Sequence, residues 1–269
     1  HLEEDVAKLQ HVRDGISKAY SLVDVNRSGV PLMETVSEPD IRSPEEAHQY
    51  LAKLHSILQY LEVCTGDMEK GAFRCDANIS VRPKGTNELS AKVEVKNMNS
   101  FRSVYRALQY EIKRQAQILE EGGRVVQETR GWVEDRGVTV SQRTKEYAND
   151  YRYFPEPDLP PLYISPEWVE EIKIHLPELP DARRDRCIAQ YGLSHYDASL
   201  LTTSKATAEF FEASLKTNQR DVDAPSRSSQ EEQGQRSKAV ANWLTGEMAR
   251  LLNQSDMDIT ETMVTPAHL

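Results

Sequence analysis

The chain contains 269 residues, of which 38% are hydrophobic and 28% are charged, and its formal net charge is −10. This length predicts one large or two medium domains with enough apolar material for a core. The acidity argues against non-specific nucleic-acid binding through a broadly basic surface. No apolar run reaches the roughly 18 residues that a membrane helix needs, so we expect a soluble protein. The three cysteines are widely spaced, which predicts reduced thiols rather than disulfides or a zinc site.

The first candidate residues lie near the N-terminus, in the sequence His1-Leu2-Glu3-Glu4-Asp5. Three consecutive carboxylates usually form an acidic surface in water, but on a strand Glu4 would face one way and its two neighbours the other. Residues 24–32 follow with an Asx-rich turn, in which Arg27 is available to a phosphate or a carboxylate. A purely structural turn explains the same residues equally well.

A helix is predicted from Ser43-Pro44-Glu45-Glu46, which supplies an N-cap, a proline in the first turn and a capping box. Residues 73–99 then predict a β-hairpin, because two alternating runs flank a turn-rich sequence at 83–87. Polar side chains occupy every second position of these runs: Arg74, Asp76, Asn78, Ser80 and Arg82 in the first, and Lys92, Glu94 and Lys96 in the second.

This hairpin predicts a surface on which cations and carboxylates meet, because alternate side chains point to opposite faces of a strand. Such a surface suits a ligand that combines phosphate with a metal ion. The alternative is an ordinary sheet with its polar face in water, but Asp76 and Asn78 are poor strand formers, which favours a function. Cys75 falls on the apolar side, so we expect it to pack in the core rather than to act as a nucleophile activated by Arg74.

A second helix is predicted from Ser100 to Gly122-Gly123, and a second hairpin from strands at 125–130 and 138–143. More paired ions occur in Gln127-Glu128-Thr129-Arg130, although exposed pairs of this kind contribute little to stability. Strands and helices in this order predict an α+β domain with a largely antiparallel sheet over residues 1–164.

Residues 150–161 are rich in proline and aromatic residues and cannot form a central strand. We interpret them as a rigid loop, and an ordinary interdomain linker is the alternative. The charged residues Arg152, Glu156 and Asp158 make this loop a candidate part of a functional site.

Helical segments dominate from residue 165, which predicts a smaller all-helical domain over residues 165–269. The expected boundaries are an N-cap at Asp181, an end at Gly192, and a further N-cap at Thr203 or Ser204. Residues 217–237 are polar and lack an apolar period, so we expect a disordered insertion there. The chain opens without methionine and stops in a sequence that resembles the start of another element, and we interpret both ends as truncated.

Several common catalytic motifs are absent. The sequence contains no GxxxxGK[ST], GxGxxG or GxSxG, which argues against a P-loop, a Rossmann nucleotide site and a nucleophile elbow. A glycosidase with paired carboxylates is an alternative, but the arginines and lysines beside these acids fit phosphate better than sugar.

Six sequence runs, spread in order over nearly the whole chain, closely resemble the B subunits of tRNA-dependent amidotransferases. They are HLEED, SLVDVNRSGVPLMETVSEPDIRSPEEA, GAFRCDANISVRP, KVEVKNMNSF, QETR and DYRYFPEPDLPPLYI. The resemblance implies a cradle domain of the glutamine synthetase/guanidino-kinase type, followed by most of a helical domain. It also implies that an N-terminal segment with further metal ligands and a C-terminal tail domain that contacts tRNA belong to the family but not to this sequence.

The resemblance further implies an enzyme that uses ATP and Mg²⁺ to phosphorylate the side-chain carboxylate of Glu-tRNA(Gln), Asp-tRNA(Asn) or both. Ammonia from a glutaminase partner, the amidase or A subunit, would then displace phosphate, and a small C subunit would complete the complex. The expected location is the bacterial cytoplasm or, as an alternative, an organelle. Two other functions stay open: a non-catalytic module that binds tRNA and the amidase partner, and a metal-dependent hydrolase.

Site residues follow from the resemblance together with the predicted strand faces. The motif HLEED implies Glu4 as a metal ligand, and we assign Asp76 and Glu94 to the same role. Arg74 and Lys96 are assigned to catalysis at the phosphate. The residues expected to bind substrate or phosphate are Asn78, Asn99, Arg27, Arg152, Glu156 and Asp158.

Overall fold

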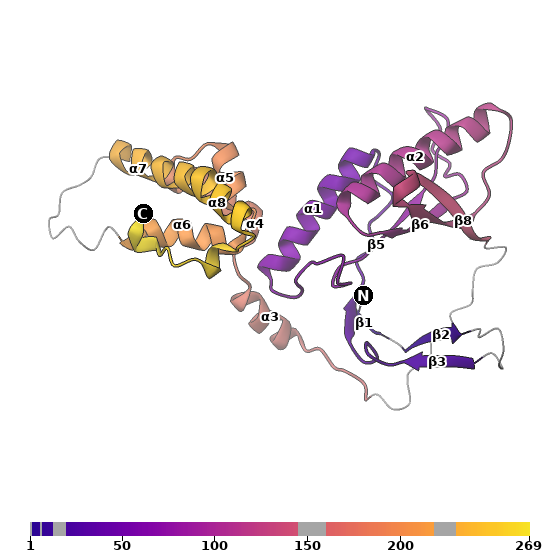
Figure 1. The fold of residues 1–269 in the computed structure, drawn as a ribbon, viewed down its shortest axis with the longest axis horizontal. Helices are drawn as coiled ribbons and strands as arrows, with labels where there is room; N and C mark the ends of the chain where they lie inside the picture. The colour runs from indigo at the N-terminus through magenta and orange to yellow at the C-terminus, as the bar shows by residue number, and fades with distance from the viewer. Residues whose placement is uncertain (1, 6, 13–19, 145–159, 218–229) are drawn as a thin grey trace. The chain divides into compact units, whose positions relative to one another are not determined.

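The computed structural model describes residues 2–5, 7–12, 20–144, 160–217 and 230–269 (Figure 1). The chain divides into two compact units, His1–Ser43 and Pro44–Leu269. In the described residues, no helix is both long and apolar enough to cross a lipid bilayer. The predicted domain boundary between residues 164 and 165 stays a prediction.

The first unit is built from short antiparallel strand pairs. β1 (Leu2–Glu4) pairs with β4 (Pro31–Met33), and β2 (Lys8–Val12) pairs with β3 (Tyr20–Asp24). The predicted Asx turn follows β3, where the backbone N–H and the side-chain amide of Asn26 both donate to Asp24 Oδ1, at 3.0 and 2.7 Å.

The second unit begins with helices and a four-stranded sheet in the order β5-β6-β7-β8. Its elements are α1 (Pro44–Tyr60), β5 (Cys75–Ile79), β6 (Val93–Met98), α2 (Phe101–Glu120), β7 (Glu128–Val133), the 3-10 turn η1 (Glu134–Arg136) and β8 (Val138–Thr144). Both predicted hairpins are confirmed, since β5 pairs antiparallel with β6 and β7 pairs antiparallel with β8.

The prediction of a largely antiparallel sheet holds for the two hairpins but not for the ladder between them. β6 and β7 are parallel, so the sheet is mixed and α2 is the crossover that joins these two strands. Parallel neighbours need a connection of a dozen or more residues, usually a helix. Local alternation reveals each hairpin but carries no information on how two hairpins pair with each other, which is why the sequence did not predict this ladder.

Helices α1 and α2 pack against each other, and α2 covers one face of the sheet (Figure 1). The predicted start of α2 near Ser100 is confirmed, and Ser100 is the N-cap, because its hydroxyl accepts a hydrogen bond from the backbone N–H of Ser103 at 3.0 Å. The buried apolar side chains of this core are Ala47, Leu51, Val93, Val95, Met98, Val104, Ala107, Leu108, Val125 and Trp132. The other face of the sheet carries the polar residues of the site.

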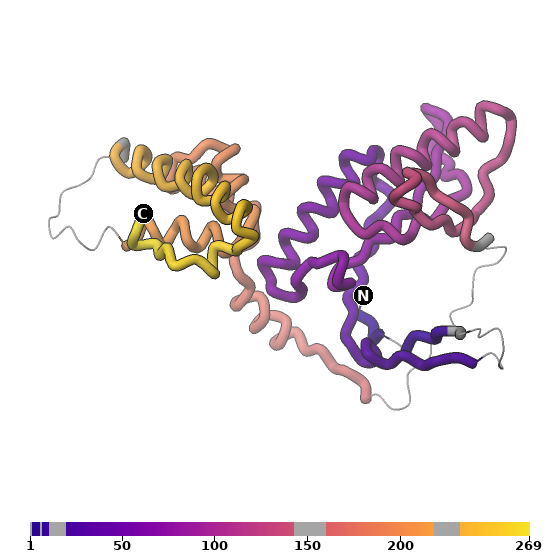
Figure 2. The backbone as a smooth tube through the Cα atoms, in the orientation of Figure 1, coloured from indigo at the N-terminus to yellow at the C-terminus, as the bar shows by residue number. Residues whose placement is uncertain are grey.

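The remaining elements are helical (Figure 2), and those from Pro180 onward contribute to a second apolar core that includes Leu201, Phe211 and Leu244. They are α3 (Pro166–His175), α4 (Pro180–Tyr191), α5 (His195–Leu201), α6 (Lys205–Thr217), α7 (Gln230–Trp243), the π-helical turn η2 (Leu244–Met248), α8 (Ala249–Ser255), η3 (Ile259–Glu261) and η4 (Pro266–His268). The predicted cap at Ser204 is confirmed by a hydrogen bond from the Thr207 N–H, at 3.4 Å.

One expectation about these helices is wrong, and a second differs where the structure describes the residues concerned. The N-cap of α4 is Leu179 rather than Asp181, because Pro180 takes the first helical position. The expected disordered insertion is helical where the structure describes it, since Thr217 ends α6 and residues 230–237 begin α7. Packing supports α7 although the sequence is polar, and Ser237 is fully buried with its hydroxyl donating to the Gln233 carbonyl at 2.8 Å. Residues 218–229 lie outside the described residues.

Candidate active site

An ion cluster lies on the polar face of the β5–β6 hairpin, and we call Lys96, Asp76 and Glu94 the Lys96 cluster. Lys96 Nζ is 3.1 Å from Asp76 Oδ2 and 3.2 Å from Glu94 Oε1. Strand alternation places Val93 and Val95, which are fully buried, on the opposite face. The predicted meeting of cations and carboxylates on one surface is therefore present, while the roles assigned to these residues stay predictions.

The Lys96 cluster is open to solvent. The side chains of Lys96, Asp76 and Glu94 are 37%, 25% and 20% exposed, so a ligand can reach all three. Burial on its own would lower the pKa of Lys96, but hydrogen bonds and charge from both carboxylates outweigh burial and raise this pKa above its ordinary value. Lys96 is therefore a permanent cation between two anions.

Thr129 on β7 holds the other oxygen of Glu94. The Thr129 hydroxyl donates to Glu94 Oε2 at 2.8 Å, and the two residues are register partners in the parallel β6–β7 ladder. Each oxygen of the Glu94 carboxylate thus has its own partner, since Lys96 contacts Oε1. The orientation of this carboxylate is fixed by two strands rather than by one.

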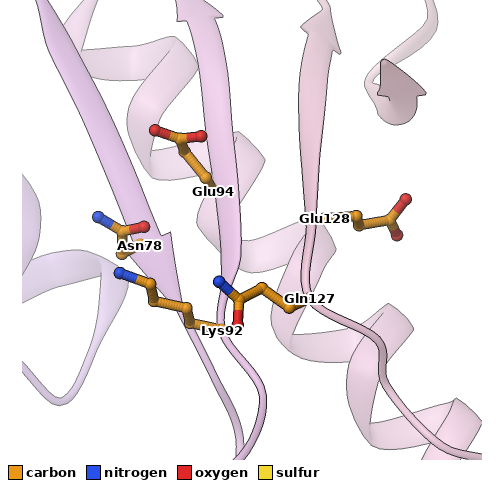
Figure 3. A pocket seen from close by; sticks show the side chains of 5 residues that line it. All are labelled: Asn78, Lys92, Glu94, Gln127 and Glu128. Carbon is orange, nitrogen blue, oxygen red and sulfur yellow. The ribbon is translucent and has the colours of Figure 1, made fainter. Parts of the chain in front are cut away.

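A small pocket adjoins the cluster and shares Glu94 with it (Figure 3). Its lining residues are Asn78, Lys92, Glu94, Gln127 and Glu128. Asn78 and Glu94 are register partners across the β5–β6 ladder, which brings the predicted site residue Asn78 beside the cluster. Glu128 points away from Asn78, Lys92 and Gln127 in Figure 3.

The donor set of the cluster fits a hard cation bound together with a phosphate. Mg²⁺ commonly takes one or two carboxylates and completes its shell with waters and substrate phosphates. Asp76 and Glu94 supply two carboxylates that already share one cation, the Lys96 ammonium, at this solvent-facing position. In the part of the chain that the structure describes, no three histidine, cysteine, aspartate or glutamate side chains form a complete metal site.

Of the other predicted site residues, two belong to the first unit, two flank the strands of the hairpin, and three lie outside the described residues. Glu4 and Arg27 belong to the first unit, where Arg27 Nε pairs with Asp5 Oδ2 at 2.9 Å. Arg74 is exposed directly before β5, and Asn99 is exposed directly after β6. The predicted residues outside the described part of the chain are Arg152, Glu156 and Asp158.

Cys75 is not suited to nucleophilic catalysis. Its side chain packs against the core under the sheet, as its place on the apolar side of the strand predicts. Burial, with a smaller contribution from the charge of Asp76, raises the pKa of its thiol to about 11. At neutral pH this thiol is almost entirely protonated, and the thiolate is the reactive form.

A buried ion network, centred on Glu111 of α2, lies on the opposite face of the sheet. Arg114 donates to both oxygens of Glu111, at 3.0 and 2.9 Å, and Arg130 Nε lies 3.2 Å from Glu111 Oε1. Arg130 also pairs with Glu128 at 2.7 Å. Glu111 is fully buried and Glu128 nearly so, so these ion pairs are not of the exposed kind that contributes little to stability.

Two β-bulges place carboxamide side chains on the polar face next to Lys96. Between paired residues, β5 advances two positions from Cys75 to Ala77 while β6 advances three from Val95 to Met98. On β8, Gln142 is the extra residue between the partners of Thr129 and Arg130. A Cβ built on Gly131 would lie 2.2 Å from Gln142 Nε2 and 3.1 Å from Asn97 Nδ2, so both amides cover this glycine.

Sequence reasoning missed Thr129, Asn97 and Gln142 as site residues. Strand alternation in β6 assigns Met98 to the polar face, yet Met98 is buried, and this conflict between apolar character and position indicates a bulge. Gly131 within an otherwise strand-like run is a second sign, because glycine in a strand often marks a bulge or a close approach. Nothing local to Thr129 identifies it, because its contact depends on the parallel ladder.

The comparisons with known proteins agree on one family. Residues 1–170 match the family described as the GatB/GatE catalytic domain. The B subunit of an aspartyl/glutamyl-tRNA(Asn/Gln) amidotransferase from Dehalococcoides mccartyi is 55% identical over 271 residues, covering 100% of this chain and 54% of that relative. The B subunit of the same name from Carboxydothermus hydrogenoformans is 52% identical over 269 residues, covering 100% and 53%. The chain thus spans about half the length of the curated relatives it matches.

Proposed function

This chain belongs to the GatB/GatE family, and from that membership we propose that it forms the ATP-using part of a tRNA-dependent amidotransferase B subunit. The observation that carries the proposal is the Lys96 cluster, which offers two carboxylates and a cation on one solvent-facing surface within the matched region. The substrates would be ATP and the side-chain carboxylate of Glu-tRNA(Gln), Asp-tRNA(Asn) or both. The partners would be the glutaminase, or A subunit, and the small C subunit.

The proposed reaction has two steps. A carboxylate oxygen of the aminoacyl side chain attacks the γ-phosphorus of ATP, the bond to the bridging oxygen breaks, and ADP leaves. Ammonia then attacks the acyl carbon, the bond to the phosphate oxygen breaks, and one ammonia proton passes to the departing inorganic phosphate, which leaves the amide. ATP is needed because a free carboxylate has no adequate leaving group.

The residues of the cluster have distinct parts in this proposal. Phosphoryl transfer depends mainly on positioning and on stabilising negative charge. Asp76 and Glu94 would hold Mg²⁺, which supplies positive charge at the phosphate oxygens when it is bound. Lys96, whose raised pKa keeps it protonated, would orient both carboxylates and offer its charge to the transferring phosphoryl group. Thr129 would hold Glu94 in place.

The proposal is tested by Glu94→Gln and Lys96→Met in the full-length protein, assembled with its partners. Each variant should abolish ATP-dependent amidation of charged tRNA, measured by conversion of aminoacyl-tRNA, because each removes a charge from the cluster. Glutaminase activity of the partner should persist, since the ammonia is made elsewhere. Amidation at the wild-type rate by either variant would exclude this site.

The same hairpin provides matched controls. Glu88→Gln and Lys84→Met make the same chemical changes at exposed positions between the two strands. Both controls should amidate at the wild-type rate. If they lose activity together with the site variants, the hairpin tolerates no substitution, and the loss cannot be attributed to the cluster.

A binding module is the second candidate function, and exposed apolar side chains favour it. Tyr163 and Ile174, before and within α3, are 81% and 80% exposed, and α3 contains no buried residue. Exposed apolar patches often mark contact with another protein. Titration of Mg·ATP into the assembled complex separates the candidates, because absence of ATP binding together with intact assembly would favour the module.

A further inference from the structure

Gly131 lies on the polar face of β7, and each of the two neighbouring strands, β6 and β8, contains a bulge. It is the register partner of Lys96 in the parallel ladder, and it has no side chain of its own. The bulge in β6 contains Asn97, and the bulge in β8 contains Gln142. Bulges are frequent next to active sites, where they redirect a side chain.

The backbone of Asn97 is held in an uncommon conformation. Its φ is 64°, in the left-handed region that non-glycine residues seldom adopt and that asparagine tolerates best. Such strained residues cluster at ligand-binding sites, where the surrounding structure maintains them. Here the conformation places the Asn97 amide over Gly131 and allows Met98 to return to the core.

The atoms that converge over Gly131 are hydrogen-bond donors. The nitrogen atoms nearest to the missing Cβ are Gln142 Nε2, at 2.2 Å, and Asn97 Nδ2, at 3.1 Å. Lys96, a third N–H donor, is the neighbouring residue on the same face. Both carboxamides are exposed, so a ligand can reach them from solvent.

The charge of the surroundings limits which anion can bind. Lys96 is already balanced by Asp76 and Glu94, so the three residues together carry one negative charge. This net charge repels any anion, but it repels a polyphosphate without its own cation more strongly than a singly charged group. A carboxylate carries a single charge and has two oxygens that accept parallel N–H bonds, which matches two amide donors.

We infer that Asn97 and Gln142, above Gly131, form a binding subsite for a carboxylate. This assignment rests on the proposed function. The ligand is the side-chain carboxylate of the aminoacyl group, held beside the Lys96 cluster before phosphoryl transfer. Gly131 is required because any side chain would displace the Gln142 amide. This subsite adds the acceptor of the phosphoryl group to a surface that otherwise accounts only for the metal and the phosphate.

The test uses three variants in the complete, assembled enzyme. Gln142→Met removes one amide at similar length, and Asn97→Gly removes the other while its backbone conformation stays accessible. Gly131→Ala leaves every polar group present but displaces the Gln142 amide. Each should raise the KM for aminoacyl-tRNA about tenfold or more, the effect of a lost hydrogen bond to a charged group, and leave the KM for ATP unchanged.

The controls separate this inference from the proposed function. Gln117→Met, at an exposed position of α2, should change neither constant. An increase in the KM for ATP alone, or an unchanged KM for aminoacyl-tRNA in all three variants, would overturn the carboxylate subsite. If Glu94→Gln still abolishes amidation in that case, the proposed function stands without the subsite, and if Glu94→Gln is fully active, the proposed function itself fails.

Discussion

At the scale of single residues, Lys96 determines the charge of the candidate site. Two carboxylates surround its ammonium at 3.1 and 3.2 Å and raise its pKa. Because the pKa of Lys96 is higher in the folded than in the unfolded state, its stabilising contribution is fully present below the ordinary lysine pKa of about 10.4. This contribution is lost only as the pH rises through the higher pKa of the folded state. Lys96 therefore stays charged over the whole neutral range.

Thr129 should control the orientation of Glu94. Thr129→Val removes the hydroxyl that donates to Glu94 Oε2 but keeps the shape of the side chain. Residues that orient a metal ligand commonly change metal affinity by about 10- to 100-fold, so we expect weaker binding of Mn²⁺ within that range. The free Mn²⁺ signal in electron paramagnetic resonance measures this directly on the assembled complex.

Thr129→Ser restores the hydroxyl and should bind Mn²⁺ nearly as the wild type does. Equal Mn²⁺ affinity in the valine variant and the wild type would show that Thr129 has no part in holding the metal ligand. A loss in the serine variant as large as in the valine variant would point to packing instead of the hydrogen bond.

The part of the site that lies within one hairpin could be predicted from the sequence. Alternation places Asp76, Glu94 and Lys96 on one face, and a local turn brings the two strands together. Thr129 and Gln142 could not be predicted in this way, because their positions depend on the pairing of β6 with β7 and on a bulge in β8. Asn97 needed the additional observation that Met98 breaks the alternation.

At the scale of elements, α2 is attached to the sheet by charge as well as by apolar packing. Burial on its own would raise the pKa of Glu111, but hydrogen bonds from Arg114, Gln115 and Thr139 outweigh it and lower this pKa. A buried carboxylate with several donors is costly to remove, because the arginines that pair with it then lack a counter-charge.

Glu111→Gln should lower the free energy of unfolding by about 3 kcal/mol, measured by urea denaturation at neutral pH. The contribution of Glu111 is present above its unfolded pKa, about 4.3, and is lost as the pH falls through the lower folded value. The difference between the variant and the wild type should therefore shrink under acidic conditions. Glu120→Gln, at an exposed position of the same helix, should change stability by less than about 0.5 kcal/mol.

A destabilisation below about 1 kcal/mol by Glu111→Gln would show that the network contributes little to the free energy of unfolding. Some buried ion pairs can be replaced with a similarly small effect on stability. A difference from the wild type that grows on acidification would contradict the lowered pKa.

The same contrast between local and long-range interactions holds for whole elements. Caps and apolar spacing predicted α1 and α2, and alternation predicted both hairpins. The beginning of α7 was missed because Gln230 to Ser237 lack an apolar period, and the fully buried Ser237 shows that packing decides its structure. The parallel ladder was missed because it joins residues that only the folded chain brings together.

At the scale of the whole molecule, α1 connects the two apolar cores of the second unit. Ala47 and Leu51 near its start pack in the core under the sheet, while Tyr60 at its end donates to the Thr202 carbonyl at 2.8 Å. Burial raises the pKa of Tyr60 to about 12, so the phenol stays a donor. Salt bridges of Lys53 with Asp181 and of Lys205 with Glu62 flank this contact.

Tyr60→Phe should weaken this connection by about 1–3 kcal/mol, because the Thr202 carbonyl is left buried without its donor. Urea denaturation gives the total loss, and faster amide hydrogen exchange in α5 would locate it. Tyr196→Phe removes an equivalent hydroxyl that is exposed, and it should have almost no effect. Equal stability of the two variants would show that the Tyr60 hydroxyl is not structural.

The crossover through α2 also has a consequence for the biogenesis of the site. Synthesis on the ribosome delivers β5 and β6 before α2, β7 and β8, so the three residues of the Lys96 cluster are present before Thr129 and Gln142. An isolated two-stranded hairpin is at best marginally stable in water. The Glu94 carboxylate therefore cannot receive its Thr129 hydrogen bond until α2 and β7 have been synthesised and have docked.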